Sequence, residues 1–201
     1  MIFLSISTFH CRYFHAMKKI CLLVLICFGL SGFAFSQDTA TSKSKWQGGL
    51  ELDVLPYLTG GYFGAGWVGK KNVRLRVLTA FVKKPDWSTP DGFTNHHITA
   101  YAAVVDFFLK PHWKGFWIGG GPVYWQSSIQ TDQQKQTAES NNWLLNGSAG
   151  YNFSLGKHFY LSPWAGLSLR VAGDTKVPVD NTTYTLPQWN PEASLKVGFI
   201  F

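Results

Sequence analysis

The sequence predicts an all-β fold, an eight-stranded antiparallel up-and-down β-barrel, and two observations support this prediction. Apolar residues recur at every second position in many segments and almost nowhere at the helical period, which is typical of strands. The connections between these segments are alternately short and long, as in a meander that gathers its tight turns at one end.

The first predicted strand shows the alternation clearly, with Leu50 and Leu52 on one face and Glu51 and Asp53 on the other. The third opposes valines and leucines to two arginines, and the fourth opposes aromatic and aliphatic residues to one aspartate. The sixth, seventh and eighth set their apolar faces against amide, hydroxyl and charged residues. The predicted strands are residues 46–55, 62–68, 73–82, 96–109, 115–126, 142–153, 157–171 and 190–201.

Two predicted strands contain residues that weaken a sheet. Pro122 and Pro163 lack the N–H that a ladder bond requires, and Gly119, Gly120 and Gly121 precede the first of them. We expect β-bulges at these prolines or strand boundaries that differ from those above.

The connections after predicted strands two, four and six are short, namely residues 69–72, 110–114 and 154–156. The other four are residues 56–61, 83–95, 127–141 and 172–189, of which the last three are long and polar. Transmembrane β-barrels of the bacterial outer membrane have short periplasmic turns and longer extracellular loops. The arrangement therefore predicts a barrel that spans a membrane.

Charged residues within the strands lie on the face opposite the apolar one. A charge on the lipid face costs about 2–4 kcal/mol at the bilayer midplane, so these charges are expected in the lumen. An eight-stranded barrel is only wide enough for side chains, which predicts a plugged lumen whose acids and bases pair. This lumen charge network is Glu51, Asp53, Arg74, Arg76, Asp106, Arg170, Glu192 and Lys196.

Hairpin registers drawn from the connections suggest how these charges pair. Arg74 is expected opposite Asp106, and Arg170 opposite Glu192. Lys196 is expected near Glu51 or Asp53, where the last strand meets the first.

Aromatic residues are expected on the outer wall near both strand ends, because their rings favour the two membrane interfaces. The residues assigned to the short-turn end are Trp67, Phe107, Phe116, Phe159 and Phe201. Those assigned to the long-loop end are Tyr57, Phe81, Trp125 and Trp143.

The N-terminal region reads as a cleaved secretory signal peptide over residues 1–36, followed by a linker over 37–45 and the barrel over 46–201. Translation is expected to start at Met17, although a long signal from Met1 fits the same pattern. All three cysteines precede the cut, which excludes a disulfide or a thiolate metal site in the mature chain. Loss of Arg12, Lys18 and Lys19 lowers the formal net charge from +7 to +4, too little for a nucleic-acid surface.

Together, the signal, the eight amphipathic strands, the sorted loops and the terminal Phe201 resemble the small outer-membrane β-barrels of the OmpA transmembrane domain, OmpX and OmpW type. The resemblance implies an all-β, eight-stranded antiparallel up-and-down transmembrane β-barrel, monomeric and located in the bacterial outer membrane. Implied partners are outer-membrane lipid, lipopolysaccharide and the barrel-insertion machinery. The insertion signal implied by the family pattern is Leu195, Val197, Phe199 and Phe201.

For function, we expect a structural or envelope-interaction role with no cofactor, no metal and no catalytic residues. A small gated pore is the first alternative. A lipid A-modifying enzyme is the second, because some such barrels use His, Ser and an acid; the residues are His96, His97, Ser127, Ser128 and Glu139. A surface-binding protein that uses its long loops and a soluble lipocalin-like carrier remain further possibilities.

Overall fold

The computed structural model describes residues 45–133 and 136–201 and contains a closed, antiparallel eight-stranded barrel. The predicted signal peptide and all but the last residue of the linker lie outside the described residues. The strands pair in the order β1-β10-β7-β6-β5-β4-β3-β2, so the predicted fold class is confirmed. Their bounds are β1 Gln47–Asp53, β2 Tyr62–Lys70, β3 Val73–Lys83, β4 Phe93–Phe108, β5 Gly115–Thr131, β6 Thr137–Leu155, β7 Phe159–Gly173 and β10 Trp189–Ile200.

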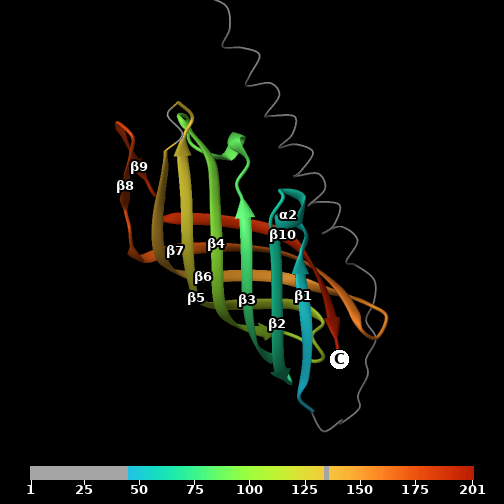
Figure 1. Cartoon of the computed structure of the whole chain (residues 1–201). Coiled ribbons are helices and arrows are strands. Elements are labelled where there is room, and N and C mark those ends of the chain that lie inside the picture. The colour runs from blue at the N-terminus through green and yellow to red at the C-terminus, as the bar shows by residue number, and fades with distance from the viewer. Residues whose placement is uncertain (1–44, 134–135) are drawn as a thin grey trace, which may run out of the picture. The chain divides into compact units, whose positions relative to one another are not determined.

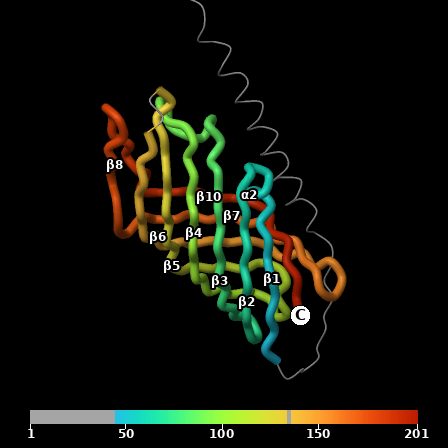
Figure 2. The backbone as a smooth tube through the Cα atoms, in the orientation of Figure 1, coloured from blue at the N-terminus to red at the C-terminus, as the bar shows by residue number. Residues whose placement is uncertain are grey.

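The barrel has two distinct ends (Figure 1). The short helix α2 (Val54–Leu58), the 3-10 turn η1 (Asp86–Ser88) and the β5–β6 turn lie at the long-loop end. The C-terminus lies at the other end, and the tube in Figure 2 brings it beside β1. There β10 closes the barrel, with Leu50 paired to Phe199 and Asp53 paired to Lys196.

The first long-end connection differs from the prediction. Val54, expected in strand one, begins α2, and the Asp53 carboxylate caps this helix by accepting a hydrogen bond from the Leu55 amide at 3.3 Å. Pro56 fits within the first helical turn, where its missing N–H costs nothing. In the part of the chain that the structure describes, no helix is long and apolar enough to cross a bilayer.

All three of the predicted long loops contain strand residues, and in two of them strand makes up a large part. β5 and β6 are 17 and 19 residues long, so most of the predicted loop 127–141 belongs to them. The last loop contains a hairpin of β8 (Lys176–Val179) and β9 (Thr182–Thr185), which was not predicted. A bilayer needs only about 9–11 residues of a tilted strand, so β5 and β6 extend well beyond that span.

The prolines in β5 and β7 cause no bulge. The register runs unchanged past Pro122 and Pro163, and each proline is simply left out of one of its two ladders. The expectation of bulges there is therefore wrong; the bounds of both strands do differ from those predicted, but the prolines still lie inside them. The register shifts lie instead between Thr94 and His97 and between Trp143 and Leu144.

The two faces of the wall separate as predicted in most strands. Leu52 and Val77 are 51% and 55% exposed, whereas Glu51 and Arg74 are fully buried inside. On outward positions of the described barrel strands, charge is confined to strand ends, at Lys70, Lys83 and Glu139.

Two of the predicted interface aromatics face inward instead. Trp67 is 5% exposed, and Trp125 packs against an interior apolar cluster that includes Phe63. In β2 the outward neighbours of Trp67 are Gly66 and Val68, and the inward positions are apolar too, so the two faces of this strand do not differ in polarity. Trp67 also packs where a neighbouring strand leaves room, because a Cβ at Gly49 would lie 2.6 Å from its ring.

Candidate functional site in the barrel interior

The lumen holds a ring of four buried charges, which we call the ion-pair ring: Glu51, Arg74, Arg76 and Asp106. Each carboxylate contacts both guanidinium groups. Glu51 lies 2.8 Å from Arg74 Nη2 and 3.1 Å from Arg76 Nη1, and Asp106 lies 2.7 Å from Arg74 Nε and 3.1 Å from Arg76 Nη2. Arg74 faces Asp106 across the β3–β4 ladder, as the predicted register has it. Two acids and two bases make the ring neutral, as buried charges require.

An aromatic cluster fills the lumen beside the ring. The Tyr160 hydroxyl donates to Glu51 Oε1 at 2.6 Å and accepts from Arg74 Nη1 and Trp67 Nε1 at 3.1 and 3.0 Å. The Arg74 guanidinium lies 5.0 Å from the Phe108 ring centroid and 5.2 Å from that of Trp67. The members of the cluster are Trp67, Phe108, Trp113, Trp117 and Tyr160. None is more than 5% exposed, so the short-turn end of the lumen is filled.

Lys196 and Asp53 share a second arrangement around Trp164. The Lys196 ammonium lies 4.2 Å from the Trp164 ring centroid and 5.0 Å from that of Trp117. The Trp164 Nε1–H donates to Asp53 Oδ2 at 2.8 Å. Although Asp53 pairs with Lys196 in the ladder, no described residue forms an ion pair within 4.0 Å of Lys196. The faces of these two rings stabilise the buried ammonium group.

The expected pairing of Arg170 with Glu192 is wrong. Glu192 stands opposite Gly166 and accepts a hydrogen bond from Ser168 at 2.6 Å. Arg170 donates to the carbonyl oxygens of Asp174 and Leu186, which bracket the β8–β9 hairpin. The prediction assumed one simple hairpin about residue 181, but the inserted β8–β9 hairpin moves the partner of Glu192 from residue 170 to residue 166.

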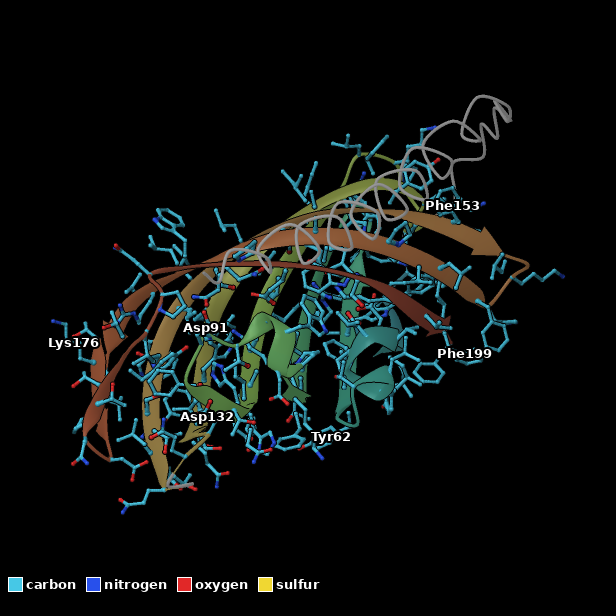
Figure 3. The ribbon with its side chains drawn as sticks, turned by 90° about the horizontal axis from the view of Figure 1, so that it is seen from above. Tyr62, Asp91, Asp132, Phe153, Lys176 and Phe199 are labelled. Carbon is cyan, nitrogen blue, oxygen red and sulfur yellow. The ribbon has the colours of Figure 1, made fainter. Side chains whose placement is uncertain are left out.

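The C-terminal strand places the predicted insertion signal on the outer wall. Leu195 and Val197 are 38% and 37% exposed, and Phe201 is 69% exposed. Phe199 packs edge-to-face against Phe159 and Phe201, with ring centroids 5.0 and 5.5 Å apart. Figure 3 shows Phe153 and Phe199 toward one end of the barrel and Asp91, Asp132 and Lys176 toward the other. Recognition of this strand by an insertion machinery stays a prediction.

The residues considered for catalysis are divided between the two faces of the wall. His96 and Ser127 are buried inside, whereas His97 pairs with Ser128 on the outer face, and Ser128 pairs with Glu139. No hydrogen bond joins a histidine to a serine among the described residues. Within the same residues, no cluster of His, Cys, Asp or Glu has the arrangement of a metal site.

A pocket lies inside the barrel at the long-loop end, separate from the ion-pair ring. We call it the loop-end pocket; Lys84, His96, Asn142 and Arg170 line it. The Lys84 amide donates to the His96 carbonyl oxygen at 2.8 Å, which holds these two residues together. Burial lowers the pKa of Lys84, and nearby Glu192 partly opposes that effect.

Sequence reasoning missed the neutral residues that complete the interior, chiefly Tyr160, Trp117 and Trp164. The signal that could have found them is their position in the strand alternation. Tyr160 and Trp164 alternate with outward residues in the same phase as Ser162 and Ser168, and both serines are buried. An aromatic residue that shares its strand face with buried hydroxyls belongs to the lumen.

The fold is that of a small outer-membrane-type β-barrel. A major outer membrane protein from Thermus thermophilus is similar in structure, with 14% identity, a TM-score of 0.51 and a match over 80% of this chain and 100% of that one. Neisserial surface protein A (NspA) matches the same shares of the two chains at 13% identity, with a TM-score of 0.46. No protein-family model and no curated protein matches the chain. At this identity, the likeness to the Thermus protein shows the fold alone.

Proposed function

We propose that the protein is an integral β-barrel of the bacterial outer membrane with a closed lumen and a structural or envelope-interaction role. The outer wall supports the membrane placement, because its mid-strand positions carry no charge in the described strands. Closure of the barrel pairs the backbone groups that lipid cannot hydrogen-bond. The membrane partners are lipid and lipopolysaccharide, and the protein acts as a monomer.

The main support for a closed lumen is the ion-pair ring, which packs on the aromatic cluster. Arg74, Asp106, Phe108 and Trp117 are all fully buried, which supports a lumen that water does not cross. An eight-stranded barrel has an interior about as wide as its side chains, and here large side chains fill it.

Two measurements on one detergent-purified sample test this proposal. A barrel that resists detergent migrates faster on a gel before boiling than after it, so heat-modifiable migration is expected. Planar-bilayer recordings on the same sample are expected to show no channel conductance. A chain that is recovered in the soluble periplasmic fraction without detergent would overturn the membrane placement.

A gated pore is the second candidate, because the ring's four ion pairs offer alternative partners to each charge. The charge-swapped double variant Arg74→Asp/Asp106→Arg distinguishes the two functions. A closed plug predicts no conductance in either protein, whereas a gate predicts conductance that changes with the swap.

We also propose that the protein is not an enzyme. The inner and outer placement of His96 and His97, with no described serine hydrogen-bonded to either, supports this proposal. Lipid A extracted from cells with and without the protein is expected to give identical mass spectra. A change in acylation that depends on the protein would refute it.

A further inference from the structure

The exposed charged side chains at the short-turn end of the barrel are all basic. The segments that form this end are residues 45–46, 69–72, 109–114 and 154–158, and they contain no aspartate or glutamate. Their six lysines and two histidines are all exposed, and we call this set the basic rim: Lys45, Lys70, Lys71, Lys110, His112, Lys114, Lys157 and His158. The long-loop end differs, because acids such as Asp86, Asp91 and Asp132 accompany the bases there.

Hydrogen bonds fix the segments of the basic rim to one another. The Asn72 amide side chain donates to the Phe108 carbonyl oxygen at 2.8 Å, and the Phe108 N–H donates to the Asn72 carbonyl oxygen at the same distance. Trp113 Nε1–H donates to Gln47 Oε1 at 2.8 Å, and the Trp113 carbonyl oxygen accepts from Asn152 Nδ2 at 3.0 Å. The backbone that carries the lysines is therefore preorganised, which lowers the entropy lost when they bind a partner.

An apolar wall borders the basic rim on its membrane side. Val68, Phe107 and Phe116 face outward there, each about half exposed. Lys70 lies two residues beyond Val68 along β2, which is about 7 Å at about 3.3 Å per residue. This separation is shorter than the Debye length of about 8 Å at physiological ionic strength, so salt does not fully screen the lysine from charges at the edge of the apolar wall.

Lysine beside an apolar wall suits the headgroup region of a bilayer. The stem of a lysine covers apolar surface while its ammonium group reaches polar groups. The Lys70 ammonium lies 6.0 Å from the ring centroid of the exposed Trp46, and tryptophan favours the same interface. Clusters of about four to eight lysines or arginines next to a membrane-spanning segment attract anionic lipid.

We propose that the basic rim binds the headgroups of anionic phospholipids in the leaflet at the short-turn end of the barrel. The lysines neutralise the net negative charge of these headgroups, while the acyl chains lie along the apolar wall. The inference rests on the membrane placement proposed above, and it adds the class of lipid and the end of the barrel that selects it.

The test is electron spin resonance of spin-labelled lipids in phosphatidylcholine vesicles that contain the purified protein. The spectrum separates lipid held at the barrel surface from fluid lipid. It therefore gives the association constant of spin-labelled phosphatidylglycerol relative to that of spin-labelled phosphatidylcholine. We expect a ratio of roughly two or more at low salt, and a ratio near unity in about 1 M sodium chloride, where the Debye length falls to about 3 Å.

Lysines at the two ends of the barrel supply matched variants. Lys70→Gln/Lys114→Gln removes two exposed charges from the basic rim and should bring the ratio about halfway to unity. Lys83→Gln/Lys176→Gln removes two exposed charges at the long-loop end and should leave the ratio unchanged. Heat-modifiable migration establishes that each variant is folded.

Three results would overturn the proposal: equal association of the two lipids with the unaltered protein, a preference that survives high salt, or an equal loss in the rim and control variants. Peptidoglycan, whose stem peptides carry carboxylates, is the other polyanion to be tested. If the lipid preference is absent and the barrel co-sediments with peptidoglycan, less strongly in Lys70→Gln/Lys114→Gln, the basic rim binds the cell wall and the lipid is refuted.

The same spectra distinguish failure of this proposal from failure of the membrane placement. Phosphatidylcholine held at the barrel surface shows that the protein lies in the bilayer, whatever its preference for charge. Such a signal without a preference for phosphatidylglycerol refutes this proposal and leaves the proposed role standing. Absence of the signal for both lipids refutes the membrane placement and this proposal with it.

Discussion

Asp106 offers the sharpest test of the closed lumen. Its carboxylate contacts Arg74 Nε at 2.7 Å and Arg76 Nη2 at 3.1 Å, and it is fully buried. Asp106→Asn keeps the shape and removes one negative charge, which leaves two guanidinium groups to share Glu51. Removal of one partner from a buried ion pair costs about 3–5 kcal/mol, because the remaining charge is uncompensated.

Arg76→Gln leaves one uncompensated negative charge in the ring, so it should lower the free energy of unfolding by a similar amount. The double variant Arg76→Gln/Asp106→Asn is neutral and retains the Arg74–Glu51 pair at 2.8 Å. Its cost should therefore be smaller than the sum of the single costs, by about 0.5–3 kcal/mol. Glu139→Gln, which alters an exposed acid on β6, is the control and should change stability by less than about 0.5 kcal/mol.

The assay is reversible urea unfolding in detergent micelles, followed by tryptophan fluorescence and by the heat-modifiable fraction on a gel. If both single variants cost less than about 1 kcal/mol and their effects add, the ring behaves like an exposed pair. Water would then reach the ring, and the closed lumen would be refuted.

Three further predictions concern packing, the lipid face and assembly. Gly150→Ala should destabilise the barrel, because its Cβ would lie 2.6 Å from the Trp117 ring, whereas Gly147→Ala on the same strand meets nothing within 4 Å and should be neutral; thermal unfolding compares them. Val77→Arg, which puts a charge on the outer wall, should cost about 2–4 kcal/mol in urea unfolding into lipid vesicles, and a cost near zero would contradict the lipid-facing assignment. A charged tag appended after Phe201 should lower the amount of folded barrel in outer-membrane fractions, and unchanged amounts would count against the insertion signal.

The alternation of residue types at every second position was sufficient to predict the barrel. It also predicted which side chains point inward and which outward in most strands, because the two faces differ in polarity in every strand that carries charge. Glu51 with Asp53, and Arg74 with Arg76, mark the inside of β1 and β3 without ambiguity. Strand order then follows from short connections between antiparallel neighbours.

Prediction failed where local chemistry does not distinguish the faces. Between Phe63 and Val68 of β2 both faces carry apolar residues or glycine, so nothing in the sequence indicates that Trp67 points inward. In β5 and β6 the segments beyond the membrane span are mostly polar, with Ile129 and Ala138 as exceptions, so the sequence there resembles a loop. The helix α2 depends on a cap at Asp53 that the strand pattern conceals.

The error at Arg170 has a different cause. A register drawn through a loop assumes that the loop adds no structure, yet β8 and β9 do, and Arg170 bonds the two ends of their hairpin. The ring charges neutralise one another within the wall, so their pairing can be predicted from strand register alone. Arg170 and Lys84 are not neutralised in this way, and the unpartnered His96 and Asn142 atoms lie beside them. Charges whose partners lie in the loops cannot be paired from strand register, which is why the prediction succeeded for the ion-pair ring and failed at the long-loop end.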